Sequence, residues 1–178
     1  MPTLLPDTTM RELLEIYPGA QRALFKKYHI GGCASCGFRS DETLGEVCAR
    51  NENLPADEVI AYLQASQEED VKAQVAPDEL AAKLRNGGAR IVDIRTREEF
   101  EAARIEGAVL FTQELMQEML AGWDRGGMVV FVDHRGERSM DAAAYFAGHG
   151  FSDARALRGG IDAWSQEVDS NVPRYHLE

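Results

Sequence analysis

No apolar run in this 178-residue sequence approaches the roughly 18 residues that a membrane-spanning helix requires. An excess of basic charge is also missing, because the formal net charge is −11. Residues 1–70 carry 6 basic and 12 acidic side chains, and residues 71–178 carry 13 and 18. We therefore expect neither nucleic acid nor a membrane as a partner.

Cysteine is scarce as well, with three in the whole chain. An odd number so small argues against a disulfide framework. The first residues lack the basic start and the long apolar core of a secretory signal peptide. We therefore expect a cytoplasmic protein, and the 44% apolar and 28% charged residues are typical of ordinary globular domains.

Helical periodicity dominates residues 1–66, which we interpret as a small all-α module. Pro18, Gly31-Gly32 and Pro55 divide it into short helices, each with one apolar face. The acidic run 67–70 then predicts a linker, although a solvated face of the preceding helix would give the same pattern.

From residue 71 onward, short apolar strands alternate with helices. The expected strands are 71–75, 90–94, 107–111, 128–132 and 154–157. This alternation predicts an α/β domain over residues 71–178, with a small parallel sheet and helices on both faces. Ligands of such sheets lie at the carboxyl ends of the strands, which is where residues 133–139 fall.

Residues 133–139 form a polar loop between the most apolar strand and a helix that Ser139 could cap. Free backbone N–H groups at such a place favour an anion. His134 could act as a general base, but a histidine without a neighbouring nucleophile is typical of a surface residue. The candidate anion-binding loop comprises His134, Arg135, Gly136, Glu137 and Ser139. We expect Arg135 and Glu137 to be solvated.

Residues 71–175 resemble the rhodanese family. The matching pieces are residues 92–95, 98–100, 104–108, 136–139 and 157–164, in this order along the chain. The resemblance implies a five-stranded parallel domain with sulfurtransferase activity. In active members a cysteine opens a six-residue loop and accepts a sulfane sulfur as a persulfide, and an arginine closes the loop. It also implies that Asp93 is a structural acid that organises neighbouring loops.

The family's six-residue loop corresponds to residues 133–138, with Arg138 at the arginine position and Asp133 at the cysteine position. A carboxylate cannot form a stable persulfide, so thiosulfate-type turnover through Asp133 is chemically excluded. We expect Asp133 to accept the loop's own N–H groups and to pair with Arg138, as a substitute for the missing anion. Nucleophilic catalysis by the carboxylate is the alternative.

All three cysteines lie in the helical module. Cys33 and Cys36 are spaced as Cys-x-x-Cys, which suits a redox pair, a persulfide carrier or half of a metal site. His29 and Cys48 could complete a zinc or iron site. However, Cys48 lies on the apolar face of its helix, which is typical of a buried core residue.

Residues 5–65 resemble a family of small helical domains of unassigned function. These are similar to the N-terminal module of di-iron proteins that repair iron–sulfur clusters. The resemblance rests on residues 10–18, 24–28, 32–36 and 43–48. It implies a role linked to thiols or sulfur.

Together the two modules predict a sulfur relay or a redox sensor, with thiol chemistry at Cys33 and Cys36. A sulfur-carrier or redox protein would be the partner, and no cofactor would be required. Two alternatives remain open: a non-catalytic docking protein, and binding of iron or zinc by the N-terminal cysteines.

Overall fold

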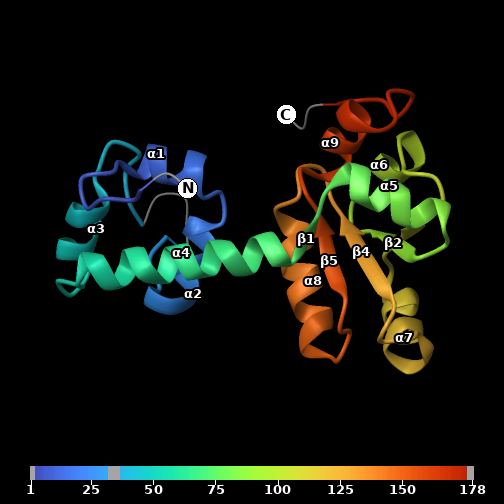
Figure 1. Cartoon of the computed structure of the whole chain (residues 1–178), viewed down its shortest axis with the longest axis horizontal. Helices are drawn as coiled ribbons and strands as arrows, with labels where there is room; N and C mark the ends of the chain where they lie inside the picture. Colours follow the sequence, from blue (N-terminus) through green and yellow to red (C-terminus); the bar gives the residue numbers. More distant parts are fainter. Residues whose placement is uncertain (1–2, 32–36, 176–178) are drawn as a thin grey trace. The chain divides into compact units, whose positions relative to one another are not determined.

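Figure 1 presents the computed structural model of the chain, in which residues 3–31 and 37–175 are described. The chain divides into two compact units, Met1–Val71 (unit 1) and Lys72–Glu178 (unit 2). The boundary between the two units lies between residues 71 and 72.

Unit 1 is built from α-helices. They are α1 (Met10–Ile16), α2 (Ala20–Tyr28), α3 (Leu44–Arg50) and α4 (Ala56–Lys72). Thr9 and Thr43 begin α1 and α3 with capping boxes, in which each threonine and the glutamate three residues later satisfy one another's backbone N–H groups. The buried apolar faces of these helices form one core that includes Cys48.

The acidic run 67–70 does not form an extended linker, because it lies within α4. Residues 67–70 are helical, which agrees with the alternative that the acidic run is a solvated face of the preceding helix. Asp70 is also held inside unit 1, since its Oδ1 lies 2.6 Å from a guanidinium nitrogen of Arg22. Helix α4 continues through Lys72, so the predicted strand at 71–75 is reduced to Gln74–Val75.

Unit 2 contains a five-stranded sheet in which every pairing is parallel. Its strands are β1 (Gln74–Val75), β2 (Ala89–Asp93), β3 (Val109–Leu110), β4 (Met128–Val132) and β5 (Ala154–Leu157). The order across the sheet is β1-β5-β4-β2-β3. The predicted fold class, a parallel sheet with helices, is therefore confirmed.

Strand β4 is central in this sheet, and all five of its residues are buried. Alternate residues enter different cores, because successive side chains of a strand point to opposite faces. Val130 and Val132 belong to one apolar cluster, whereas Val129 and Phe131 belong to another. Each face of the sheet is thus covered, as the continuous apolar sequence of this strand indicates.

Five helices connect or follow the strands of unit 2 (Figure 1). They are α5 (Pro77–Arg85), α6 (Arg97–Ala102), α7 (Gln113–Gly122), α8 (Arg138–Gly148) and α9 (Gly160–Glu167). Among residues 3–31 and 37–175, no helix combines the length and the apolar character needed to cross a membrane.

Candidate functional site: an anion-binding loop filled by Asp133

The loop of residues 133–137 connects the carboxyl end of β4 to the first residue of α8. The neighbouring strand β2 ends beside it, since the backbone N–H of Ile94 donates to the carbonyl of Val132 at 2.9 Å. Parallel topology therefore brings the loop together with the residues that follow Asp93.

Asp133 is 3% exposed, and its carboxylate points into the loop. Oδ1 accepts the backbone N–H of Gly136 at 2.5 Å and the hydroxyl of Ser139 at 3.1 Å. Oδ2 accepts the backbone N–H of Arg138 at 2.7 Å. Both carboxylate oxygens are thus bound by donors of the loop and of the first turn of α8, where an anion is favoured.

Two predicted contacts of this loop are wrong in detail. Ser139 does not cap the helix, because α8 begins one residue earlier and Ser139 lies in its first turn. Glu137 is the N-cap and its side chain makes no capping bond, so the Asp133 carboxylate accepts the first amide of the helix instead. Arg138 binds Asp133 through its backbone N–H, and within the described part of the chain its guanidinium forms no ion pair with that carboxylate.

The turn at Gly159-Gly160 packs directly against the back of the loop. A Cβ atom added to Gly160 would lie 2.5 Å from the carbonyl carbon and oxygen of His134, and Gly160 has a φ of +62°. The first amides of α9 also donate to the loop: Ile161 to the carbonyl of Asp133 at 2.9 Å, and Asp162 to that of His134 at 3.2 Å. The N-terminus of α9 therefore supports the loop. It can lie this close to the loop backbone because Gly160 has no side chain.

His134 is buried, at 8% exposed, rather than a surface residue. Its ring stacks on that of Tyr175, with centroids 4.5 Å apart and planes inclined by 15°. Nε2 of His134 lies 2.9 Å from the backbone carbonyl oxygen of Tyr175. A carbonyl can only accept, so Nε2 carries the hydrogen of this bond.

Tyr175 also reaches the end of β2. Its hydroxyl donates to a carboxylate oxygen of Glu99 at 2.7 Å and accepts from the guanidinium of Arg95 at 2.8 Å. Burial raises the pKa of Tyr175 to about 12, and the acceptor Glu99 raises it as well, whereas donation by Arg95 lowers it. The phenol is therefore a neutral bridge between two charged groups at ordinary pH.

Asp93 and Arg95 form a fully buried ion pair, with NH2 of Arg95 2.6 Å from Oδ2 of Asp93. Asp93 also accepts the backbone N–H of Arg95 at 3.1 Å, and the guanidinium donates to the carbonyl of Ala103 at 2.5 Å. Burial alone would lower the pKa of Arg95, but the hydrogen bonds to Asp93 and Tyr175 raise it. This pair joins the end of β2 to the turn after α6.

Arg135, Glu137 and Arg138 are exposed. They lie on the solvent side of the loop, whereas the other loop residues, including His134, are buried.

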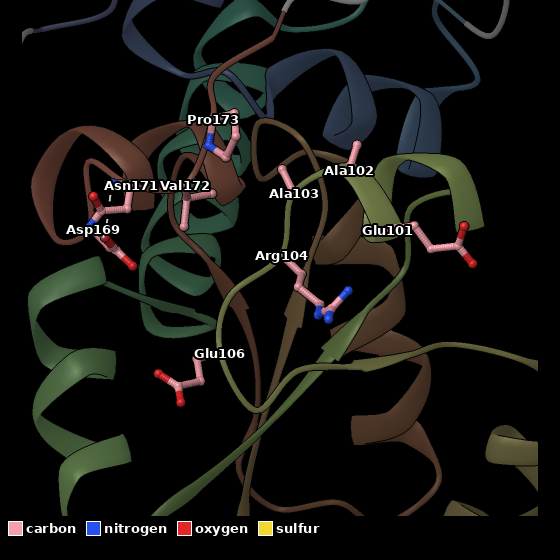
Figure 2. Close-up of a pocket in the computed structure, with 9 residues that line it drawn as sticks. All are labelled: Glu101, Ala102, Ala103, Arg104, Glu106, Asp169, Asn171, Val172 and Pro173. Carbon is pink, nitrogen blue, oxygen red and sulfur yellow. Dashed lines mark hydrogen bonds between the residues drawn. The ribbon is translucent and has the colours of Figure 1, made fainter.

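A shallow pocket of about 400 Å³ lies elsewhere in unit 2 and contains none of the loop residues (Figure 2). It is bounded by residues 101–106 on one side and by residues 169–173 on the other. Its lining mixes Arg104 with the acids Glu101, Glu106 and Asp169. We do not assign it to the candidate site, because the buried polar groups converge at Asp133 and not here.

Cys33 and Cys36, the candidate thiol site, lie outside the described residues. Cys48 is 2% exposed within the core of unit 1, and burial raises the pKa of its thiol, which opposes a role as a metal-ligating thiolate. His29 is exposed and ends α2 in a left-handed conformation. Among the residues that the structure does describe, no three metal-ligating side chains form a cluster.

Comparison with known proteins identifies the fold of unit 2. Residues 76–167, about half of the chain, match the family model of the rhodanese-like domain. The chain belongs to the rhodanese family. The thiosulfate sulfurtransferase GlpE of Pseudomonas aeruginosa (strain LESB58) is 36% identical over 95 residues, which cover 53% of this chain and 86% of that protein. GlpE of Stutzerimonas stutzeri (strain A1501) is 33% identical over 96 residues, with 54% and 88% covered.

Solved structures also match part of the chain. The human single-domain sulfurtransferase TSTD1 is 25% identical, with 53% of this chain and 96% of that chain covered and a TM-score of 0.48. A rhodanese-like domain protein from Staphylococcus aureus is 26% identical, with 58% and 98% covered and a TM-score of 0.45.

Four residues of the candidate site were not singled out from the sequence: Arg95, Glu99, Gly160 and Tyr175. The close approach of Gly160 could have been suspected from the glycine pair that opens the last helix. Nothing in the local pattern indicates that Tyr175 contacts a loop about forty residues earlier.

Proposed function

We propose that this rhodanese-like protein does not turn over thiosulfate through its loop, and that its thiol chemistry takes place at Cys33 and Cys36. It would act in a sulfur relay or as a redox sensor. The rhodanese-like unit would serve as the docking or sensing scaffold for a sulfur-carrier or redox protein.

The observation that carries this proposal is the position of the Asp133 carboxylate. It accepts hydrogen bonds from Gly136, Arg138 and Ser139, so its negative charge lies where the loop would otherwise bind an anion. A second anion would meet like charge at this point. A carboxylate also offers no sulfur atom on which a persulfide could form.

The described residues around the cysteine pair support a role for that segment. Gly31 and Gly37 flank it and their backbones touch, because a Cβ atom on Gly37 would lie 2.3 Å from the Cα of Gly31. Gln21 donates to the carbonyl of Gly31 at 3.1 Å, and Arg50 donates to that of Gly37 at 2.7 Å. The two ends of the segment thus touch, and each is bound by a residue of a different helix.

A relay at this pair needs no bound cofactor. The thiolate of Cys33 would attack the outer sulfur of a donor persulfide, and the donor thiolate would leave with the electrons of the broken sulfur–sulfur bond. An acceptor thiolate would take the same sulfur from Cys33 in a second, identical step. No net oxidation or reduction occurs in this sequence.

A thiosulfate–cyanide assay on the full chain tests the loop. We expect no thiocyanate formation through the loop in the wild type, and a rise on the order of tenfold or more in Asp133→Cys. Glu137→Cys is the matched control, because it adds a thiol at an exposed position of the same loop. Wild-type activity that survives Cys33→Ser and Cys36→Ser, but is lost in Asp133→Asn, would contradict the proposal.

Thiol-labelling kinetics test the cysteine pair. At neutral pH we expect Cys33 or Cys36 to react with iodoacetamide far faster than the buried Cys48, with the sites resolved by peptide mass spectrometry. Two unreactive cysteines would contradict the relay. The same protein, purified without oxygen, would be analysed for iron and zinc, and a stoichiometric metal would favour the metal-binding alternative over a free thiol pair.

A further inference from the structure

Residues 172–175, which we call the strap, return from the end of α9 to the loop. Val172 is buried, and its carbonyl accepts the hydroxyl of Ser165 at 2.5 Å. Arg174 forms an ion pair with Asp162, with Nε 2.7 Å from Oδ1. Tyr175 then stacks on His134. The strap is thus held by separate contacts along its length.

The contacts of Tyr175 differ from ordinary surface packing, because its ring, its backbone carbonyl and its hydroxyl all have partners, which lie in two different parts of the fold. The ring faces His134 of the loop, and the backbone carbonyl accepts from the same residue. The hydroxyl contacts Arg95 and Glu99, which follow β2. Tyr175 therefore ties the loop to the end of the neighbouring strand.

A pocket borders the strap just before this residue. The pocket of Figure 2 lies between residues 169–173 and residues 101–106, so solvent space separates part of the strap from the segment beside it. Arg174 is exposed apart from its ion pair, and exposed ion pairs contribute little to stability. Tyr175 is the residue through which the strap contacts His134 of the loop.

We propose that the strap is a releasable latch, in which Tyr175 holds the loop 133–138 closed through His134 and its departure loosens the loop. The device concerns access to the loop and does not depend on where the thiol chemistry takes place. A ligand or partner that reaches the buried His134 side of the loop would have to displace this contact first.

Hydrogen exchange on the full chain tests the latch directly. We expect amides of residues 132–140 to exchange about tenfold faster in Tyr175→Ala, since one aromatic stack and one or two hydrogen bonds are lost. Tyr175→Phe keeps the ring and loses only the hydroxyl, so a smaller increase, about threefold, is expected.

The chain provides a matched control in Tyr145. Its ring also packs on a histidine, His149, with centroids 4.2 Å apart, and its carbonyl also contacts that histidine. This pair lies at the far end of α8, so Tyr145→Ala should leave the exchange of the loop amides unchanged.

A chemical probe gives an independent readout. A thiol placed in the loop by Asp133→Cys should be alkylated by iodoacetamide about tenfold faster when Tyr175→Ala is added. Peptide mass spectrometry separates this site from the native cysteines. Unchanged loop exchange and unchanged alkylation in folded Tyr175→Ala would overturn the proposal. If Tyr175→Ala does not fold, unchanged exchange of the loop amides in Tyr175→Phe would overturn the proposal.

Discussion

The backbone nitrogen of Arg138 lies 2.7 Å from Oδ2 of Asp133, so the first amide of α8 is bound to a carboxylate of the same chain. Helix N-termini attract anions because their first N–H groups have no partner within the helix. Here that partner is covalently part of the loop. The loop thus supplies its own carboxylate to this helix start.

Replacement of Asp133 by alanine should lower the free energy of unfolding of unit 2 by about 1–3 kcal/mol, because buried donors of the loop lose their acceptor. Tryptophan fluorescence during urea unfolding reports this unit alone, since Trp123 and Trp164 both lie in it. Glu137→Ala, at an exposed position of the same loop, should change the value by about 0.5 kcal/mol or less.

The same alanine variant should recover anion binding. Sulfate or thiosulfate at millimolar concentration should raise the Tm of Asp133→Ala and leave that of the wild type unchanged, at constant ionic strength set with chloride. Equal effects on the two proteins would show that Asp133 does not occupy the anion position.

Gly160→Ala should destabilise unit 2 by about 2 kcal/mol or more, because a methyl group would collide with the backbone of His134 at a positive φ. Gly87 is the natural control. It has nearly the same φ, +63°, but nothing lies within 4 Å of an added Cβ. Gly87→Ala should therefore cost only the conformational penalty of about 1 kcal/mol. Similar losses in the two variants would argue against the close contact with the loop.

Arg95→Met should destabilise unit 2 by about 3–5 kcal/mol, because Asp93 would remain buried without its partner. Arg97→Met, at an exposed position two residues later, should have little effect. Addition of Asp93→Asn to Arg95→Met should restore part of the loss, which urea unfolding would measure. If the double variant is as unstable as Arg95→Met alone, Arg95 stabilises unit 2 through its bonds to Ala103 and Tyr175 and not through Asp93.

The stability of unit 2 should fall as the pH rises from about 10 to about 12. Burial raises the pKa of Tyr175 to about 12, so the unfolded chain releases this proton first and is favoured over that range. The stabilisation is fully present below pH 10. Solvent screening of the partly exposed phenol limits it to the order of 1 kcal/mol. Tyr175→Phe should lack this component of the pH dependence, and an identical profile in both proteins would contradict the assignment.

Much of the architecture follows from local pattern. Each local signal lies within a few residues of the element that it specifies. Examples are the apolar run of β4, Thr96 at the start of α6 and Pro77 at the start of α5. The acidic end of α4 stayed open between a linker and a helical face, because these last turns are polar on every side and show no apolar period. The role of Ser139 was missed because a carboxylate six residues earlier reaches the same helix start.

The sequence by itself determined the family of unit 2, its alternation of strands and helices and the presence of Asp133 directly after the most apolar strand. Each of these is a property of residue order. Only the tertiary structure decided that Asp133 turns inward to the loop amides, that Gly160 supports the loop from behind and that Tyr175 holds His134. These contacts join residues separated by up to about forty positions. The parallel sheet brings these residues together at the carboxyl ends of its strands, so no local sequence pattern could indicate the contacts.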